Sequence, residues 1–600
     1  MRRAAPLLAL ATLPLAAVAA PPQPRQQPSV AAAPATPAET SFAALGRGYL
    51  DGLARISPVY ATQLGDHRFD SDLPDMSATG RAARVAFSRD MLARLGAIDR
   101  AALPPQQQVD AALLENALRY DIWDAETLQS WAWDPQVYND TAGSALYGLA
   151  ARDFAPWPVR LRAATTRMEK LPALLAQMRA SLDPARVPAI HAQTVARQNE
   201  GLNDIVDGML APHLGALPPV DQSRFRAAAD RLRKAVAAHQ TWLDSVLVPG
   251  AKGDFRLGAV LYDQKLAFAL NSTLGRDEIK RRAQAALTAT RSEMYGIART
   301  LLAGRAGAPP LPTAPSEAQQ QAAIEAALEL SYRHRPARGA VIATAEAALA
   351  RATAFVRSAR LVSVPATPLR IIPMPRFQQG VAIAYCDSPG PLDRNLGTFY
   401  AVSPIPAEWS DAQATSFLRE YNDYMIDDVT VHEAMPGHYL QLAHANAGQT
   451  PLRAVLASGS FIEGWAVYAE GQMADAGYRK DDPLFRLTML KMRLRSISNA
   501  LLDIAIQTEG MDHDAAMQLM TRSAFQQERE AEGKWTRARL TSAQLPTYFV
   551  GYSEHAELRR DAEAKAGAAF DRMAYHDALL ATGSPPVRYA RALMFGEVVR

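Results

Sequence analysis

Apolar residues recur at three- and four-residue spacing through most of the chain beyond residue 40. This spacing gathers them on one face of an α-helix, and neighbouring helices have to cover such a face. The pattern is present in Phe42–Ile56, Thr79–Ile98, Gln106–Gln129, Pro158–Met178 and Pro188–Leu210, continues over 222–247, 276–302 and 317–360, and resumes from 411 to the C-terminus. We therefore predict a mainly α protein in which residues 41–600 form a single large multi-helix domain with a sizeable core.

The pattern changes between residues 361 and 406. Leu361–Ile372 and Gly380–Tyr385 are short, rich in β-branched residues and bounded by Pro or Gly, and Gly397–Ser403 is a third strand candidate. Together they predict one small β-sheet just before the helix that carries His432. Gly380–Tyr385 is either an edge strand that pairs with an extended peptide or a structural strand with both edges covered.

The first forty residues have the composition of an export signal followed by a leader. A cationic start, MRR, precedes an apolar run, and the letters AVA at positions 17–19 supply a cleavage pattern, so residues 1–19 are expected to be a secretory signal peptide. The apolar run is too short for a membrane span, and no cysteine lies at the cleavage region to carry a lipid anchor. Residues 20–40 are rich in Pro, Gln, Ala and Ser and predict a disordered leader. We therefore expect a secreted or periplasmic protein without a membrane span.

Charge and cysteine content exclude several classes of protein. The formal net charge is +3 at pH 7 and no long basic run is present, so a nucleic-acid partner is not expected. Cys386 is the only cysteine. It excludes an intramolecular disulfide framework and a metal site built from several cysteines of one chain.

The stretch Val431–Gln441, VHEAMPGHYLQ, begins like the zinc-peptidase motif H-E-x-x-H but has a proline where the second histidine belongs. In that motif two histidines one helical turn apart bind zinc, and the glutamate beside the first is the general base. A spacing of six residues puts His438 about 120° away from the face of His432 on a regular helix. Pro436 and Gly437 disfavour a regular helix, so we predict a local bulge that brings both histidines to one metal ion.

A third ligand is expected from the following helix. Glu463 lies in the nearly continuous apolar run FIEGWAV, where a buried carboxylate needs a partner. Zinc accepts imidazole nitrogen and carboxylate oxygen, so we predict one Zn²⁺ ion held by His432, His438 and Glu463. Glu470, seven positions later on the same face, either orients a ligand histidine or is a plain surface glutamate.

HEAMPGHYLQ followed by FIEGWAVYAE resembles the bacterial domain-of-unknown-function 885 family, whose pattern is similar to H-E-x-x-P-G-H-H-L-Q and then E-G-W-A-x-Y-x-E. Other matching stretches are LGDHRFDSDLPDMS, SPGPLDRNLGTFYAVSP and YFVGYSEHAELRRDAEAKAGAAFDRMAYHDALLATGSPP, so the resemblance covers essentially the whole mature chain. The family looks like a helical zinc-peptidase group, similar in plan to angiotensin-converting enzyme and related helical carboxypeptidases. The resemblance implies a helical body that encloses a cleft.

The same resemblance implies His432, His438 and Glu463 as zinc ligands, with Glu433 as the base. The chain departs from the family pattern at Tyr439, where many members have a second histidine. His444 is a further histidine within reach. Which side chain beyond the proline faces the ion is therefore open.

Polar residues near the C-terminus extend the predicted site. Tyr548, Tyr552, His555 and Arg559 lie at helical spacing and would form one polar stripe. We expect Tyr548 and Tyr552 to stabilise an oxyanion, the alternative being core tyrosines with satisfied hydroxyl groups. His555, Arg559 and Arg394 are candidates for substrate binding. Arg394 either pairs with a substrate carboxylate or is an ordinary loop arginine.

These residues predict an exported zinc-dependent metallopeptidase that hydrolyses short peptides, in the manner of a carboxypeptidase, dipeptidase or oligopeptidase. Glu433 would take the proton of the activated water and pass it to the leaving amine. Two alternatives are open: a zinc amidase or esterase that acts on non-peptide substrates, and a non-catalytic periplasmic binding protein on the same scaffold. The intact Glu433 argues against the second, because a structural zinc site needs no base.

Overall fold

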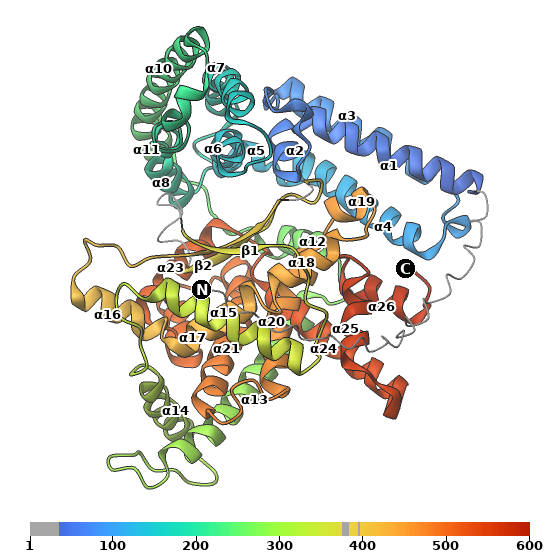
Figure 1. The fold of residues 1–600 in the computed structure, drawn as a ribbon. Coiled ribbons are helices and arrows are strands. Elements are labelled where there is room, and N and C mark those ends of the chain that lie inside the picture. The colour runs from blue at the N-terminus through green and yellow to red at the C-terminus, as the bar shows by residue number, and fades with distance from the viewer. Residues whose placement is uncertain (1–34, 375–382, 394–395, 600) are drawn as a thin grey trace, which may run out of the picture.

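The computed structural model describes residues 35–374, 383–393 and 396–599. The signal peptide expected at residues 1–19 and residues 20–34 of the leader expected at 20–40 lie outside the described residues. The predicted mainly α fold is confirmed (Figure 1).

The first helix begins inside the segment that was predicted to be a disordered leader. Helix α1 spans Pro37–Ile56 and so begins before residue 40. The hydroxyl of Thr36 accepts a hydrogen bond from the backbone N–H of Glu39, and the Glu39 carboxylate accepts one from the N–H of Thr36. This reciprocal cap starts a helix inside a segment whose composition is that of a leader.

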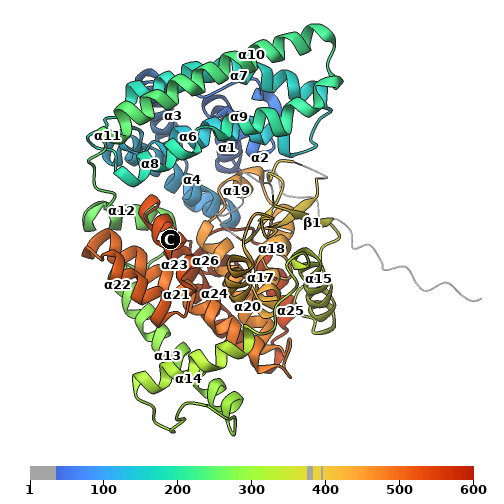
Figure 2. The same ribbon diagram turned by 90° about the vertical axis from the view of Figure 1, so that its left-hand side faces the viewer.

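The first part of the chain forms the upper region in Figures 1 and 2. Its helices after α1 are α2 (Pro58–Leu64), α3 (Ala78–Gly96), α4 (Pro105–Trp123), α5 (Ser130–Trp133), α6 (Gln136–Ala151), α7 (Trp157–Ser181), α8 (Ala189–Gln198), α9 (Gly201–Ile205), α10 (Pro219–Trp242) and α11 (Val248–Gly250). Helix α7 packs against α6 and α10. Leu161, Met168 and Phe225 lie in the buried cluster that these helices share.

The second part forms the lower region. Its helices are α12 (Gly258–Leu270), α13 (Arg276–Leu302), α14 (Glu317–Ser331), α15 (Val341–Ser358), α16 (Asp411–Glu420), α17 (Asp423–Glu433), α18 (His438–Asn446), α19 (Pro451–Val455), α20 (Gly459–Asp475), α21 (Pro483–Glu509), α22 (His513–Met517), α23 (Glu528–Leu540), α24 (Pro546–Ala566), α25 (Arg572–Leu580) and α26 (Val587–Phe595). Helix α21 is buried along most of its length and packs against α13, α17 and α24.

One small sheet precedes α17, as predicted. Its strands are β1 (Leu369–Pro373), β2 (Ala384–Asp387) and β3 (Thr398–Val402). The order is β1-β3-β2, with β1 parallel and β2 antiparallel to β3. Strand β2 lies at an edge of the sheet and begins later than predicted; residues 380–382 of the predicted strand lie outside the described residues.

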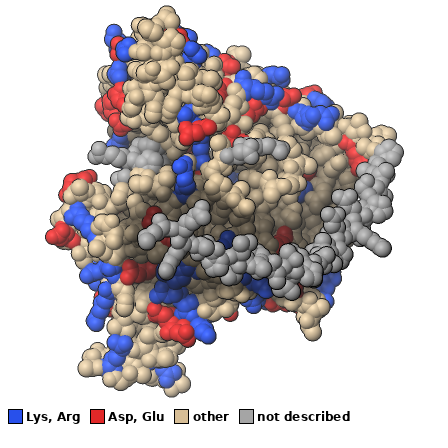
Figure 3. Space-filling model, viewed as in Figure 1, with Lys and Arg blue, Asp and Glu red and all other residues tan. Residues whose placement is uncertain are grey.

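The described helices lack the combination of length and apolar composition that a membrane crossing needs. On the face in Figure 3, Lys and Arg side chains are interspersed with Asp and Glu over the described residues.

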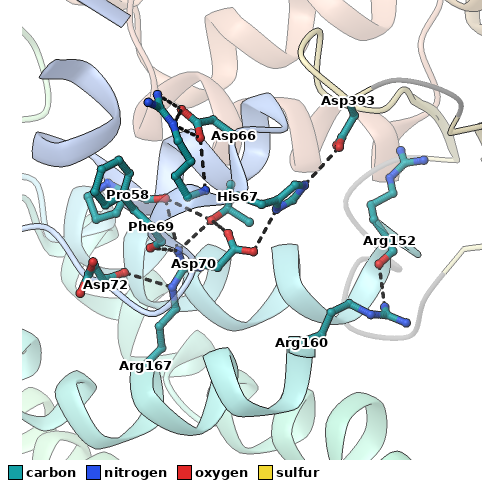
Figure 4. A network of polar contacts seen from close by, with 12 residues as sticks. Pro58, Asp66, His67, Phe69, Asp70, Asp72, Arg152, Arg160, Arg167 and Asp393 are labelled. Carbon is teal, nitrogen blue, oxygen red and sulfur yellow. Dashed lines mark hydrogen bonds and ion pairs between the residues drawn. The ribbon is translucent and has the colours of Figure 1, made fainter. Parts of the chain in front are cut away.

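A polar network joins the upper region to the loop that follows β2 (Figure 4). The His67 ring lies between two carboxylates, with Nδ1 3.0 Å from Asp70 and Nε2 3.1 Å from Asp393. The ring also stacks on Phe154, with 3.6 Å between centroids. Burial works to lower the pKa of His67, but its hydrogen bonds to Asp393 and Asp70 outweigh burial and raise the pKa to about 9. The ion pairs therefore persist at neutral pH.

Replacement of His67 is expected to destabilise the protein in a pH-dependent way. The folded-state pKa of about 9 lies above the ordinary value of 6.5, so the stabilisation is complete below pH 6.5 and is lost as the pH rises through 9. We expect His67→Gln to lower the free energy of unfolding by about 1 kcal/mol at pH 6, a value discounted for partial exposure, and by much less at pH 9.5. Denaturant unfolding at both pH values measures this difference.

His213→Gln is the matched control, because that ring stacks on Trp157 and contacts no carboxylate among the described residues. An equal loss of stability at pH 6 and pH 9.5 for His67→Gln would show that the ion pairs do not act as described.

Candidate metal centre

The H-E-x-x-P-G-H stretch is a break between two helices and not a bulge within one. Helix α17 ends at Glu433 and α18 begins at His438. The N–H groups of Ala434 and Met435 both donate to the carbonyl of Thr430, at 3.0 and 3.2 Å. Pro436 has no N–H to continue the helix. The chain therefore turns between the two histidines, which is a larger departure from a helix than the sequence predicted.

The tight turn between α17 and α18 requires a glycine at position 437. Its N–H donates to the Val431 carbonyl at 2.9 Å. A Cβ atom at position 437 would lie 1.8 Å from the carbonyl oxygen of His432, so a side chain cannot be accommodated without moving backbone. The turn brings the rings of His432 and His438 to 4.8 Å between centroids, with planes at 89°.

Both histidines point toward Glu463 of α20. The Nε2 atoms of His438 and His432 lie 3.3 and 3.8 Å from the same carboxylate oxygen, Oε2 of Glu463. One ligand atom from each of the three residues lies within 4.8 Å of the others. The structure therefore brings together the three residues that were predicted as metal ligands.

The two alternative residues point elsewhere. The Tyr439 hydroxyl donates to the Thr367 carbonyl at 2.5 Å. His444 Nε2 lies 2.6 Å from the Ser363 carbonyl. Of the three candidates beyond Pro436, His438 is the one that faces the Glu463 carboxylate.

Helix α20 is held in place by two close contacts. The Trp465 indole N–H donates to the Pro436 carbonyl at 2.9 Å, which fixes α20 against the turn. On its other side α20 packs on α24 through two glycines, because a Cβ on Gly551 would lie 1.9 Å from the Ser460 carbonyl and one on Gly464 would lie 2.3 Å from the Gly551 carbonyl carbon. Glycine at both positions allows the two backbones to approach and brings α24 next to Glu463.

The Glu470 carboxylate fixes the orientation of the His432 ring. The Nδ1 atom of His432 lies 2.6 Å from Glu470 Oε1, and Glu470 is 1% exposed. The alternative of a surface glutamate is therefore wrong. Burial works to lower the pKa of His432, but Glu463 and Glu470 hold the pKa well above its usual value. Because Nδ1 is engaged by Glu470, Nε2 is the nitrogen that faces Glu463 and that would bind a metal ion.

Asp428, one turn before His432, is a residue that the sequence analysis missed. It is fully buried, and neither carboxyl oxygen has a hydrogen-bond partner among the described residues. Burial, with Glu470 close by, raises the pKa of Asp428 well above its usual value. The signal available in the sequence was its position four residues before a candidate ligand.

Glu433 lies between the cluster and the sheet. Its Oε2 accepts a hydrogen bond from the backbone N–H of Cys386 in β2 at 2.9 Å. Burial raises the pKa of Glu433, and the neighbouring histidines oppose that rise. The N–H of Cys386 is therefore engaged by Glu433 and is not free to pair with a peptide strand.

The predicted polar stripe on α24 divides into two parts. Burial, strengthened by the Glu463 carboxylate, raises the pKa of Tyr548 to about 12, so Tyr548 keeps its proton at neutral pH. Tyr552 lies one turn further, with the Arg493 guanidinium 4.9 Å from its ring centroid.

His555 and Arg559 hold helices together. His555 is 0% exposed, its Nε2 lies 3.0 Å from the Phe461 carbonyl, and burial lowers its pKa to about 4. Arg559 donates to Glu563 at 2.7 Å and to Gln472 of α20. Neither placement supports the predicted role in substrate binding. Arg394 lies outside the described residues.

The donor set fits a metal ion. Glu463 Oε2 is a buried acceptor without a well-aligned hydrogen bond among the described residues, although two imidazole nitrogens point at it. Two imidazoles and one carboxylate are a set that zinc accepts in sites that keep one position open.

Two cavities among the described residues are lined by other side chains. The larger, about 1220 Å³, is in the upper region and is lined by residues that include Tyr60, Tyr147 and Lys265. The smaller, about 400 Å³, is lined in part by Cys386 and by the loop that follows it. The three clustered ligand candidates are not among the described residues that line either cavity.

Substitution of Gly437 is expected to disrupt the turn. Gly437→Ala places a methyl group against the His432 carbonyl, and we expect a loss of about 2–4 kcal/mol in the free energy of unfolding. Gly448→Ala is the matched control, since nothing lies within 4 Å of an added Cβ there. Equal stability of the two variants in urea unfolding would contradict the geometry of the turn.

The fold and the site define the class of this protein: a large, mainly helical protein with a buried His-His-Glu cluster. The chain belongs to the bacterial family DUF885, proteins of unknown function, whose family model matches residues 58–594. The family resemblance noted from the sequence is therefore confirmed, while zinc binding and peptidase activity stay predictions.

Two solved structures share the fold. A "putative lipoprotein of unknown function" from Shewanella oneidensis is 31% identical, with a TM-score of 0.79 over 92% of this chain and 99% of that one. A "putative lipoprotein" from Colwellia psychrerythraea is 16% identical, with a TM-score of 0.75 over 93% and 99% of the two chains. No curated protein matches the chain.

Proposed function

We propose that this protein is an exported zinc-dependent metallopeptidase that hydrolyses short peptides. The observation that carries the proposal is the convergence of His432, His438 and Glu463 on one point with the Glu433 carboxylate beside them. His432, His438 and Glu463 would hold the ion. A zinc ion bound there would polarise the scissile carbonyl and lower the pKa of water.

Glu433 has the features of a general base. The Cys386 N–H fixes one of its oxygens, which leaves the other to take a proton. Burial raises its pKa and so makes it a better proton acceptor than an exposed carboxylate. In this role Glu433 takes the proton of the attacking water and returns it to the leaving amine.

Tyr548 is the proposed donor to the developing oxyanion. Its pKa of about 12 means that the hydroxyl holds its proton at neutral pH, as a hydrogen-bond donor must. Glu470 serves the same reaction indirectly, because its hydrogen bond to Nδ1 fixes the His432 ring and its tautomer.

Export is supported by two observations. The first residues have the composition of a signal peptide. The two structural neighbours are described as "putative lipoprotein", a class of protein that is exported.

Glu433→Gln tests the proposed mechanism. The purified wild type is expected to contain one zinc per chain by mass spectrometry and to cleave a short-peptide library, and chelation is expected to abolish the cleavage. Glu433→Gln should keep the zinc, because position 433 lies outside the proposed ligand set, and should lose about 10²–10⁴-fold in kcat.

Glu346→Gln, an exposed carboxylate on α15, is the control and should retain full activity. The proposal would be wrong if the purified wild type contained no zinc and Glu433→Gln hydrolysed peptides as fast as the wild type.

A further inference from the structure

The larger cavity has enough room for a short peptide. Its volume is about 1220 Å³, which exceeds the roughly 300–1,000 Å³ that is usual for sites of drug-sized ligands. Side chains of α2, α4, α6 and α9 line it, and Lys265 of α12 adds one residue from the lower region. A concave site of this size is the first place to look for a ligand of the upper region.

The cavity wall is negatively charged, although the whole chain has a formal net charge of +3. Seven acidic and four basic residues line it. Arg84 pairs with Asp121 at 2.9 Å. The other three basic residues, Arg81, Arg197 and Lys265, donate to uncharged acceptors in the described part of the chain. Most of the negative charge on the wall is therefore not compensated by these four cations.

Two of the lining carboxylates have no partner among the described residues. The side chains of Asp140 and Asp204 form no hydrogen bond or ion pair there, and both residues are exposed. They belong to α6 and α9, which pack against each other. Charges of one sign that line a cleft focus its electrostatic field and raise the local concentration of ligands of the opposite sign. This wall therefore favours a cation.

Aromatic rings form much of the rest of the wall. The lining aromatic residues are Tyr60, Tyr120, Trp131, Trp133, Tyr138 and Tyr147. The faces of such rings attract ammonium and guanidinium groups, and one contact of this kind is present in the wall, where the Arg81 guanidinium lies 4.0 Å from the Trp131 ring centroid. Tyr60 is 43% exposed, so part of its surface is accessible to a ligand. The rings and the carboxylates favour the same class of ligand.

The larger cavity adjoins the smaller one, which extends to the proposed general base. Tyr60 and Gln63 of α2 line both cavities. Cys386 lines the smaller cavity, and its backbone N–H donates to Glu433 at 2.9 Å. The two cavities therefore lead from the upper region toward the strand that contacts Glu433.

We propose that the larger cavity binds positively charged peptides, through their N-terminal ammonium group or through Lys and Arg side chains. Asp140 and Asp204 bind the cationic group, and the aromatic rings contact the apolar part that carries it. As a statement about substrates, the proposal rests on the proposed function and specifies it: short peptides that carry positive charge. The binding itself does not require hydrolysis.

Binding without turnover tests the proposal. The full-length Glu433→Gln chain is titrated calorimetrically with four pentaalanine amides: one N-acetylated, one with a free N-terminus, one N-acetylated with a central Lys and one N-acetylated with a central Glu. We expect the free-N-terminus peptide, the Lys peptide or both to bind about 10-fold more tightly than the neutral peptide, and the Glu peptide to bind most weakly.

The peptide that is preferred identifies the source of the bound charge, the N-terminus or a side chain. Equal affinity for all four peptides, or binding of none of them, overturns the proposal.

Two double variants locate the binding. Asp140→Asn/Asp204→Asn keeps side-chain size and removes two negative charges, so we expect it to lose most of the preference for cationic peptides. Asp481→Asn/Glu408→Gln is the matched control, because Asp481 and Glu408 are also exposed, form no hydrogen bond or ion pair among the described residues and line neither cavity. All four residues are exposed, so both variants should unfold at the wild-type Tm. An unchanged preference in Asp140→Asn/Asp204→Asn would place the binding elsewhere and contradict the proposal.

Turnover of the same peptides separates this proposal from the proposed hydrolysis. Wild type is expected to cleave the preferred cationic peptide with a kcat/KM about 10-fold above that of the neutral one. Cleavage of no peptide, together with the binding preference, would defeat the hydrolysis and still support the binding site. Equal cleavage of all four, together with equal affinities, would overturn the binding site and leave the hydrolysis standing.

Discussion

The candidate site depends on the contact between the backbone at Gly437 and the carbonyl end of α17. Two carbonyls at the end of that helix, those of Thr430 and Val431, accept N–H groups from residues beyond it. These hydrogen bonds turn the chain between Glu433 and His438, where α18 begins. Without this turn, His432 and His438 would lie on different faces of one helix, and the Glu463 carboxylate could meet only one of them.

Much of this arrangement follows from the sequence, because the chemistry of the residues is more restrictive than their spacing. His432, His438 and Glu463 could be predicted since imidazoles and a carboxylate within an apolar run need partners. The helical body could be predicted from its periodicity. The choice between His438 and its neighbours Tyr439 and His444 could not, because it depends on backbone carbonyls at residues 363 and 367, far away in the chain.

Other features could not be predicted for a related reason. His555 and Arg559 share a helical face with Tyr548, and a face seen in one sequence does not show which helix covers it. Here α20 covers that face through the glycine contact at Gly464 and Gly551, so His555 becomes a buried link between helices. Asp428 depends in the same way on which charges its neighbours present, and it has no motif of its own.

The loop after β2 ties two distant parts of the molecule to one short length of backbone. Cys386, whose N–H holds Glu433, and Asp393, which pairs with His67, are seven positions apart, and Pro389 and Pro391 limit the torsional freedom between them. This short segment therefore links the His67 ring of the upper region to the Glu433 carboxylate. The upper region therefore bears on the position of Glu433, the proposed general base. Under the proposed function, mutations in the upper region would alter turnover without touching a residue of the cluster.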